Sequence, residues 1–189
     1  MPAHALDRDY FEAGLRDLSE YLLSNELYWP LSPGRSDLPR LTVGGLLICR
    51  LRLRARSAPG EERTRFGHLE AQLDEIRSRW RAAWDARVAR ESRARLDLWR
   101  NYIVDDRRLP DEKAGVYRHE VQGRVMIHLL GDEVPLPPAE TEALAGLDQI
   151  LEAHFRPGKF VWESGLATEF PETPFWYLYG TLQPVEEQA

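Results

Sequence analysis

The sequence predicts a mainly all-α protein: a helical bundle with one very long central helix and an extended, aromatic-rich C-terminal arm. Apolar residues recur at spacings of three and four in several separate segments, which is the period of an amphipathic helix. One such segment, residues 61–101, contains no proline and a single glycine. After residue 158 the helical spacing ends, and aromatic residues mixed with prolines take its place. We expect the bundle to occupy residues 1–158 and the arm residues 159–189 of a single domain.

The composition is that of an ordinary globular protein. The 189 residues are 43% hydrophobic and 30% charged, which is enough apolar material for a core of its own. The longest aliphatic run, residues 46–49, is far shorter than the roughly 20 residues of a membrane-spanning helix, and the N-terminus lacks the pattern of a signal peptide. Cys49 is the only cysteine, so no disulfide can form within the chain. We therefore expect a cytoplasmic protein with no membrane partner.

The chain opens with an expected helix and a loop. An apolar stripe at positions 11, 15, 18 and 22 predicts a first helix that Asp7 caps and that ends near Asn25. Residues 29–39 hold three prolines and a glycine, which predicts a loop.

Residues 42–56 fit two structures. Over the last eight of them apolar side chains alternate with arginines, as in a half-buried strand. Leucine, arginine and alanine are good helix formers, so we prefer a helix with Thr42 as its cap. Its inward side chains would be Leu47, Leu51 and Ala55. A strand stays the alternative.

The segment 61–101 is the expected spine of the bundle. Its apolar side chains step by threes and fours: Phe66, Leu69, Leu73, Ile76, Trp80, Trp84 and Val88, continued by Ala94, Leu98 and Tyr102. On the other faces, acid-first pairs four residues apart favour a solvated helix surface: Glu61/Arg65, Glu75/Arg79 and Glu91/Arg95. A helix of about 40 residues would be roughly 60 Å long, longer than a compact domain of this size is wide.

Two further helices are expected. A stripe at positions 117, 121, 125 and 129 predicts one that begins after a break near Pro110 and stops at Gly131. Pro138 suits the first turn of the next helix, in which positions 144, 147, 151 and 155 align and which closes at Pro157.

The C-terminal arm carries the candidate partner-binding residues. Residues 160–182 hold seven of the 19 aromatic residues of the chain. Aromatic side chains bury large areas and dominate the energetics of interfaces, so five of them are candidates for binding a partner: Trp162, Phe175, Trp176, Tyr177 and Tyr179. The alternative is an arm that covers a groove between the chain's own helices. An arm exchanged between two copies would satisfy both interpretations.

A cluster of arginines suggests another partner. Between Arg50 and Arg108 the chain holds 16 arginines against ten acidic residues, although its overall net charge is −6. The most concentrated cations, Arg50, Arg52, Arg54 and Arg56, are candidates for contacts with a nucleic-acid backbone. The competing interpretation is that acidic parts of the same protein face these arginines.

Motifs for catalysis, metal ions and cofactors are missing. No histidine has a glutamate three residues before it, so the ligand pair of a di-iron bundle is missing, and His119 and His128 lie on opposite sides of one helix. Gly44-Gly45 is followed by no lysine, unlike a phosphate loop. Ser164 has a glycine on one side only, unlike a nucleophile elbow. We expect neither a metal ion nor a cofactor, and we name no catalytic residue.

These features predict a non-catalytic protein-interaction or scaffold protein that binds itself or another protein. A helix longer than its domain needs a partner to cover its projecting apolar stripe, and a second copy in a homodimer would supply one. Light scattering should then give the mass of a dimer, and this mass should be unchanged at high salt. One alternative is a nucleic-acid-associated accessory protein, whose binding would weaken steeply with salt. Another is an enzyme whose pocket is assembled from residues distant in sequence. No motif resembles that of a known family, so resemblance does not decide among the three.

Overall fold

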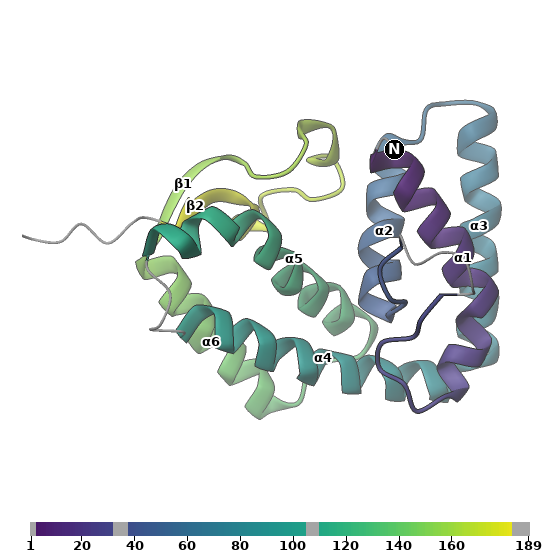
Figure 1. Cartoon of the computed structure of the whole chain (residues 1–189), viewed down its shortest axis with the longest axis horizontal. Coiled ribbons are helices and arrows are strands. Elements are labelled where there is room, and N and C mark those ends of the chain that lie inside the picture. The colour runs from purple at the N-terminus through teal and green to yellow at the C-terminus, as the bar shows by residue number, and fades with distance from the viewer. Residues whose placement is uncertain (1–2, 32–37, 105–109, 183–189) are drawn as a thin grey trace, which may run out of the picture.

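The computed structural model describes residues 3–31, 38–104 and 110–182, and these form six α-helices and a small two-stranded sheet (Figure 1). The helices are α1 (Ala3–Leu23), α2 (Val43–Arg56), α3 (Glu61–Arg79), α4 (Arg81–Val104), α5 (Pro110–Glu133) and α6 (Pro138–Ala153). The strands are β1 (Phe155–Phe160) and β2 (Tyr179–Leu182), with short 3₁₀ turns η1 (Ser164–Leu166) and η2 (Trp176–Leu178) between them. The predicted mainly all-α fold class is confirmed.

The long central helix is present only in part, because it breaks at Trp80. Trp80 has φ −111° and ψ 34°, outside the helical range, and it separates the 19 residues of α3 from the 24 residues of α4. Figure 1 shows α3 upright and α4 running across the base of the molecule. The prediction of one unbroken rod is therefore wrong. The change of direction lets both stretches bury their apolar stripes against the chain itself, whereas a straight rod would leave part of the stripe in water.

One carboxylate of α5 forms hydrogen bonds to both α3 and α4, on either side of the break between them. Glu133 accepts a hydrogen bond from Arg77 of α3 (2.9 Å) and another from the indole of Trp84 of α4 (3.1 Å). Nothing near residue 80 resembles a helix breaker, since neither glycine nor proline is there. The break is thus set by tertiary contacts.

Residues 43–56 form a helix, which confirms the preferred of the two predicted structures. Thr42 is its N-cap, and its Oγ1 accepts a hydrogen bond from the amide of Gly45 (2.9 Å). Leu47 is buried as predicted, while Leu51 and Ala55 are half-buried. The leucine and arginine alternation places arginines around the helix and not along one strand face.

Several predicted helix ends lie elsewhere. α1 begins before Asp7, which is an interior residue of the helix and not its cap, and α1 ends at Leu23. α5 continues through Gly131 to Glu133, since one glycine costs only about 1 kcal/mol in a helix. α6 stops at Ala153, and Phe155 begins β1. Residues 32–37 of the expected loop, the break at 105–109 and residues 183–189 of the arm lie outside the described residues.

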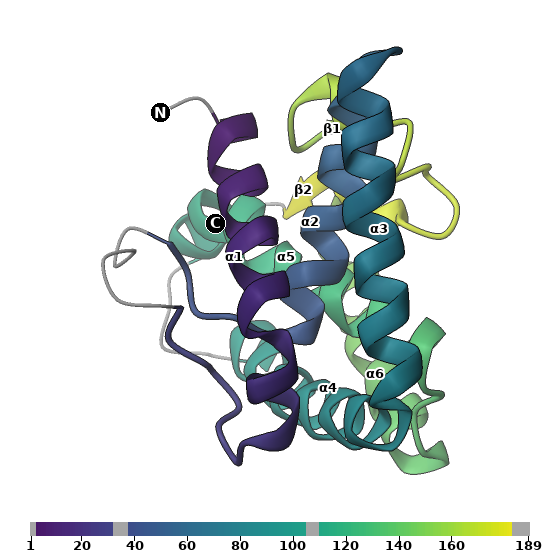
Figure 2. The same ribbon diagram turned by 90° about the vertical axis from the view of Figure 1, so that its right-hand side faces the viewer.

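Two hydrophobic cores share α4. The first lies among α1, α2, α3 and the beginning of α4, and the second lies among α4, α5, α6 and the C-terminal arm. Trp84 and Val88 enter the first core, and Leu96 and Trp99 enter the second. Figures 1 and 2 show α1, α2 and α3 side by side in the first part of the molecule. None of the described helices is long and apolar enough to span a membrane.

The C-terminal arm covers the second core of the same chain. β1 and β2 pair antiparallel, so the expected extended arm contains a hairpin-like sheet. Tyr117 of α5 donates a hydrogen bond to the carbonyl of Tyr177 (2.6 Å), and the Trp162 indole donates to the carbonyl of Arg118 (3.1 Å). These bonds attach the arm to α5 at residues 162 and 177.

We expect His128 to make stability depend on pH. Its ring lies edge-on to Phe175 at 4.9 Å, and burial lowers its pKa below the ordinary 6.5, with Asp132 and Asp148 opposing and Arg124 adding to this shift. The unfolded chain then binds a proton more readily than the folded chain, so stability is lost as the pH falls through and below 6.5. Urea unfolding at pH 7.5 and 5.5 should show a smaller loss for His128→Gln than for the wild type. Equal losses would contradict this assignment.

Candidate functional site

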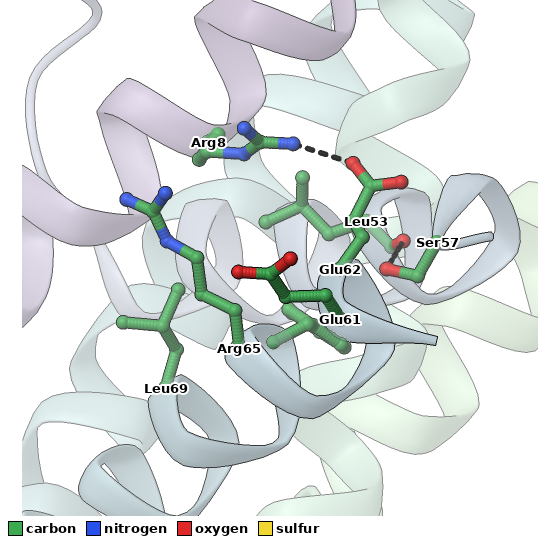
Figure 3. A pocket seen from close by; sticks show the side chains of 8 residues that line it. Arg8, Leu53, Ser57, Glu61, Glu62, Arg65 and Leu69 are labelled. Atoms are coloured by element: carbon green, nitrogen blue, oxygen red, sulfur yellow. Dashed lines mark hydrogen bonds and ion pairs between the residues drawn. The ribbon is translucent and has the colours of Figure 1, made fainter. Parts of the chain in front are cut away.

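One hollow lies at the end of the first core, between α1, the end of α2 and the start of α3 (Figure 3). Its volume is about 340 Å³, and its mouth is ringed by charged side chains. Arg8 is paired with Glu62, and Arg65 with Glu12 (2.9 Å). Because both cations already have carboxylate partners, this hollow offers little to a charged ligand.

Three adjoining hollows lie where the two cores meet, and we call them together the seam cleft. Their volumes are about 360, 460 and 210 Å³, and Gln122 of α5 lines all three. The first lies against α1, α2 and α4, the second against α1, α2 and the arm, and the third against α4. Clefts between packed units of a protein are common ligand sites. The seam cleft is therefore the candidate functional site.

One face of α5 is the wall of the seam cleft. Its lining residues follow one another at helical spacing: Gly115, Arg118, His119, Gln122 and Met126. A neighbouring face of the helix carries Tyr117, Val121 and Val125, all buried in the second core. Within the described part of the chain, the side chains of Arg118, His119 and Gln122 have neither an ion pair nor a hydrogen bond. They are available to a ligand.

Arg52 of α2 stands across the cleft from this wall. Its guanidinium lies over the ring of Trp162 at 5.0 Å, and its nearest carboxylate is that of Asp7, 4.0 Å away. Its Nε is buried and has no hydrogen-bond acceptor among the described residues. Burial lowers the pKa of Arg52, and Asp7 offsets part of that change, yet an arginine stays charged at neutral pH. Arg52 is thus a largely desolvated cation with unused donors.

The carboxylates beside Arg52 are occupied by another arginine. Arg56 forms ion pairs with both Asp7 and Glu163, the latter at 2.8 Å. The hydrogen bond from Arg56 is the main reason that the pKa of Glu163 is lowered. Arg52, Arg56 and Arg118 line the second hollow of the cleft together with Asp7 and Glu163, so arginines outnumber carboxylates there.

A buried ion pair of α4, Glu91 with Arg95, lies beside the cleft at the start of α2. Glu91 is fully buried, and it accepts hydrogen bonds from Arg95 (2.6 Å) and from the amide of Gly44 (3.1 Å). Arg95 also donates to Thr42 Oγ1 (3.0 Å) and lines the cleft. The expected place of this pair on a solvated face is wrong. Its carboxylate lies at the positive end of the α2 dipole, which favours an anion.

Cys49 borders the cleft as a protonated thiol. Its Sγ donates to the carbonyl of Asp7 (3.0 Å), and burial raises its pKa well above the ordinary value. A neutral, buried thiol is a poor nucleophile. Across the described residues, no group of three or more histidine, cysteine, aspartate or glutamate side chains is arranged to hold a metal ion.

The four arginines proposed for nucleic-acid contacts are mostly paired with acidic side chains. Arg50 and Arg54 both reach Glu70, the former at 2.7 Å, and their hydrogen bonds lower the pKa of Glu70 although burial alone would raise it. Arg56 is paired as described above, and Arg52 has a longer contact, with Asp7 at 4.0 Å. This arrangement favours the competing interpretation, in which acidic parts of the protein face the arginines. Nucleic-acid binding stays a prediction.

The five aromatic residues proposed for partner binding lie against α5 and one another. Phe175, Tyr177 and Trp162 are buried, and Trp176 and Tyr179 are half-buried. Their rings pack within the second core, so this chain does not expose them as one apolar surface. Self-association stays a prediction, because an arm exchanged between two copies would bury the same rings.

The sequence indicates other roles for Arg52 and Trp162 and gives no signal for the α5 side of the cleft. Arg118 and Gln122 are four residues apart on the polar face of a predicted helix, where most side chains are simply solvated. Only the fold brings them opposite Arg52.

Comparisons with protein-family models, with curated proteins and with solved structures find no match for the chain. The function must therefore be argued from the geometry of the seam cleft.

Proposed function

We propose that this protein is a non-catalytic binding protein whose seam cleft takes a small anionic ligand. One observation carries the proposal: Arg52 and Arg118 line the same hollow, and neither has a carboxylate closer than 4.0 Å among the described residues. The protein as a whole is acidic, with a net charge of −6, so a cationic cleft departs from the rest of the chain.

The energetics of burial support an anion in this place. A buried polar group without a partner costs free energy, and a charged one costs more. Hydrogen bonds between an arginine and a carboxylate or phosphate are about twice as strong as those between neutral groups. An anion at Arg52 would supply an acceptor for the Nε, which the described residues do not.

No reaction is part of this proposal. The cleft's thiol, Cys49, is protonated and bonded to a backbone carbonyl. His119 is exposed at the mouth, with no carboxylate to orient it among the described residues. Neither group is arranged for catalysis, so the proposal is limited to binding an anion.

Isothermal titration calorimetry at low ionic strength tests the proposal with three probes: sodium phosphate, sodium acetate and sodium octanoate. At least one should bind, and Arg52→Met should weaken it about 10- to 100-fold, since a hydrogen bond to a charged group contributes about 1.5–3 kcal/mol. Methionine keeps an unbranched stem against Trp162 and removes the charge. Arg118→Met, at an exposed position, should weaken binding in the same direction.

Arg79→Met is the matched control. Arg79 is exposed on α3 and paired with Glu75 at 3.0 Å, away from the cleft. Its loss should change the affinity less than twofold. Absence of binding for all three probes at about 10 mM, or an equal effect of Arg79→Met, would overturn the proposal.

A further inference from the structure

The two larger hollows of the seam cleft differ in chemistry. The hollow of about 460 Å³ is lined by charged and polar side chains, among them Arg52, Arg118 and His119. The hollow of about 360 Å³ has the larger apolar share, with Leu6, Tyr28, Pro39, Ile48 and Met126 in its wall, and Arg40 and Arg95 also line it. We call them the cationic chamber and the apolar chamber.

The two chambers adjoin each other. Four residues line both of them: Leu6, Asp7, Arg52 and Gln122. Arg52 therefore stands at their boundary, with its guanidinium over the ring of Trp162 on the cationic side. A ligand bound by Arg52 has an apolar space directly beside its charged group.

We infer that the ligand is an amphipathic anion, a carboxylate or phosphate carried on an apolar body. The charged group lies between Arg52 and Arg118, and the apolar body extends past Gln122 into the apolar chamber toward Met126 and Tyr28. This inference rests on the proposed function and adds the class of ligand to it. A purely inorganic anion would leave the apolar chamber unused, and a neutral apolar molecule would leave the arginines without acceptors.

Length of the apolar body is the variable to test. Burying one CH₂ group contributes about 0.8 kcal/mol, which corresponds to roughly fourfold in affinity. Calorimetry at constant ionic strength should therefore show octanoate binding at least tenfold more tightly than acetate or phosphate. Benzoate distinguishes a flat ring from a straight chain as the preferred apolar body. Uncharged 1-octanol tests whether the anion is needed.

Substitution of the apolar chamber separates its contribution from that of the arginines. Met126→Gln keeps the size of the side chain but makes it polar, and it should weaken octanoate several-fold while leaving acetate or phosphate within twofold. Tyr28→Ser, in the segment between α1 and α2, should also weaken the binding of octanoate. Leu23→Gln is the control, because Leu23 is exposed at the end of α1 and lines none of the three hollows.

The outcomes distinguish this inference from the proposed function. If acetate, phosphate and octanoate bind equally and Arg52→Met weakens all of them, the anion site stands and the amphipathic ligand is overturned. If 1-octanol binds as tightly as octanoate, the arginines do not select the ligand and the inference is also overturned. If no anion binds, the proposed function falls and this inference falls with it.

Discussion

Replacing Glu91 with alanine should lower the free energy of unfolding by about 3–5 kcal/mol, because removal of one member of a buried ion pair leaves the other charge buried alone. Glu91 is fully buried, and the side chain of Arg95 is 13% exposed. The substitution also takes the acceptor away from the amide of Gly44. Urea unfolding, with an unchanged dependence on denaturant concentration, measures the loss.

Two further variants test the cause of that loss. Glu91→Gln keeps an oxygen for Gly44 but loses the charge, and we expect a smaller loss of about 1–3 kcal/mol. Glu75→Ala breaks an ion pair with the same spacing and order, Glu75/Arg79, whose side chains are more than 60% exposed. Its effect should stay within about 0.5 kcal/mol. Similar losses for Glu75→Ala and Glu91→Ala would contradict the role of burial.

The contrast between these two pairs shows that the spacing of an acid and an arginine does not by itself predict whether the pair is exposed. Both have the acid four residues before the arginine, and the spacing alone placed both on a solvated face. Glu91 follows Trp84 and Val88 at steps of four and three, so it lies on the same face of α4 as these buried residues. A charged residue type favours the surface, but at residue 91 its position on the buried face of α4 decides.

Periodicity predicted the helices well and their long-range geometry poorly. The apolar stripe of residues 61–88 is real, but after α4 leaves the first core the buried side shifts, so that Leu96 and Trp99 are buried and Leu98 is exposed. An apolar stripe extrapolated at fixed helical spacing does not reveal that α4 packs first against one core and then against the other. The bend at Trp80 has the same origin.

The seam cleft could not be predicted from local patterns. Its arginines lie 66 residues apart in the sequence, on α2 and α5, and they face each other only because the two cores meet there. The sequence did show a concentration of arginines between residues 50 and 56. Which of them lies farthest from a carboxylate depends on Asp7, Glu70 and Glu163, and their positions are set by the fold.

Gly45→Ala should lower the free energy of unfolding by about 1–3 kcal/mol, although alanine normally stabilises a helix relative to glycine. A Cβ at this position would lie 2.3 Å from the Tyr10 hydroxyl and 3.0 Å from Thr42 Oγ1, so either α1 or the cap of α2 must shift. Tyr10 is buried and its hydroxyl accepts a hydrogen bond from the amide of Thr42 (3.4 Å), which leaves the ring little freedom to move. Thermal and urea unfolding measure the loss.

Gly67→Ala is the matched control for this clash. Gly67 lies within α3, and a Cβ there would have no neighbour within 4 Å, so alanine should stabilise the protein by about 0.5–1 kcal/mol. In the double variant Tyr10→Phe/Gly45→Ala the oxygen nearest to the new methyl group is gone, so the two changes together should cost less than the sum of the single changes. If the costs simply add, the tyrosine oxygen is not what excludes a side chain at residue 45. The contact with Thr42 Oγ1 is then what excludes a side chain, and Gly45→Ala should cost less in a Thr42→Ala background, which lacks that oxygen, than in a Tyr10→Phe background.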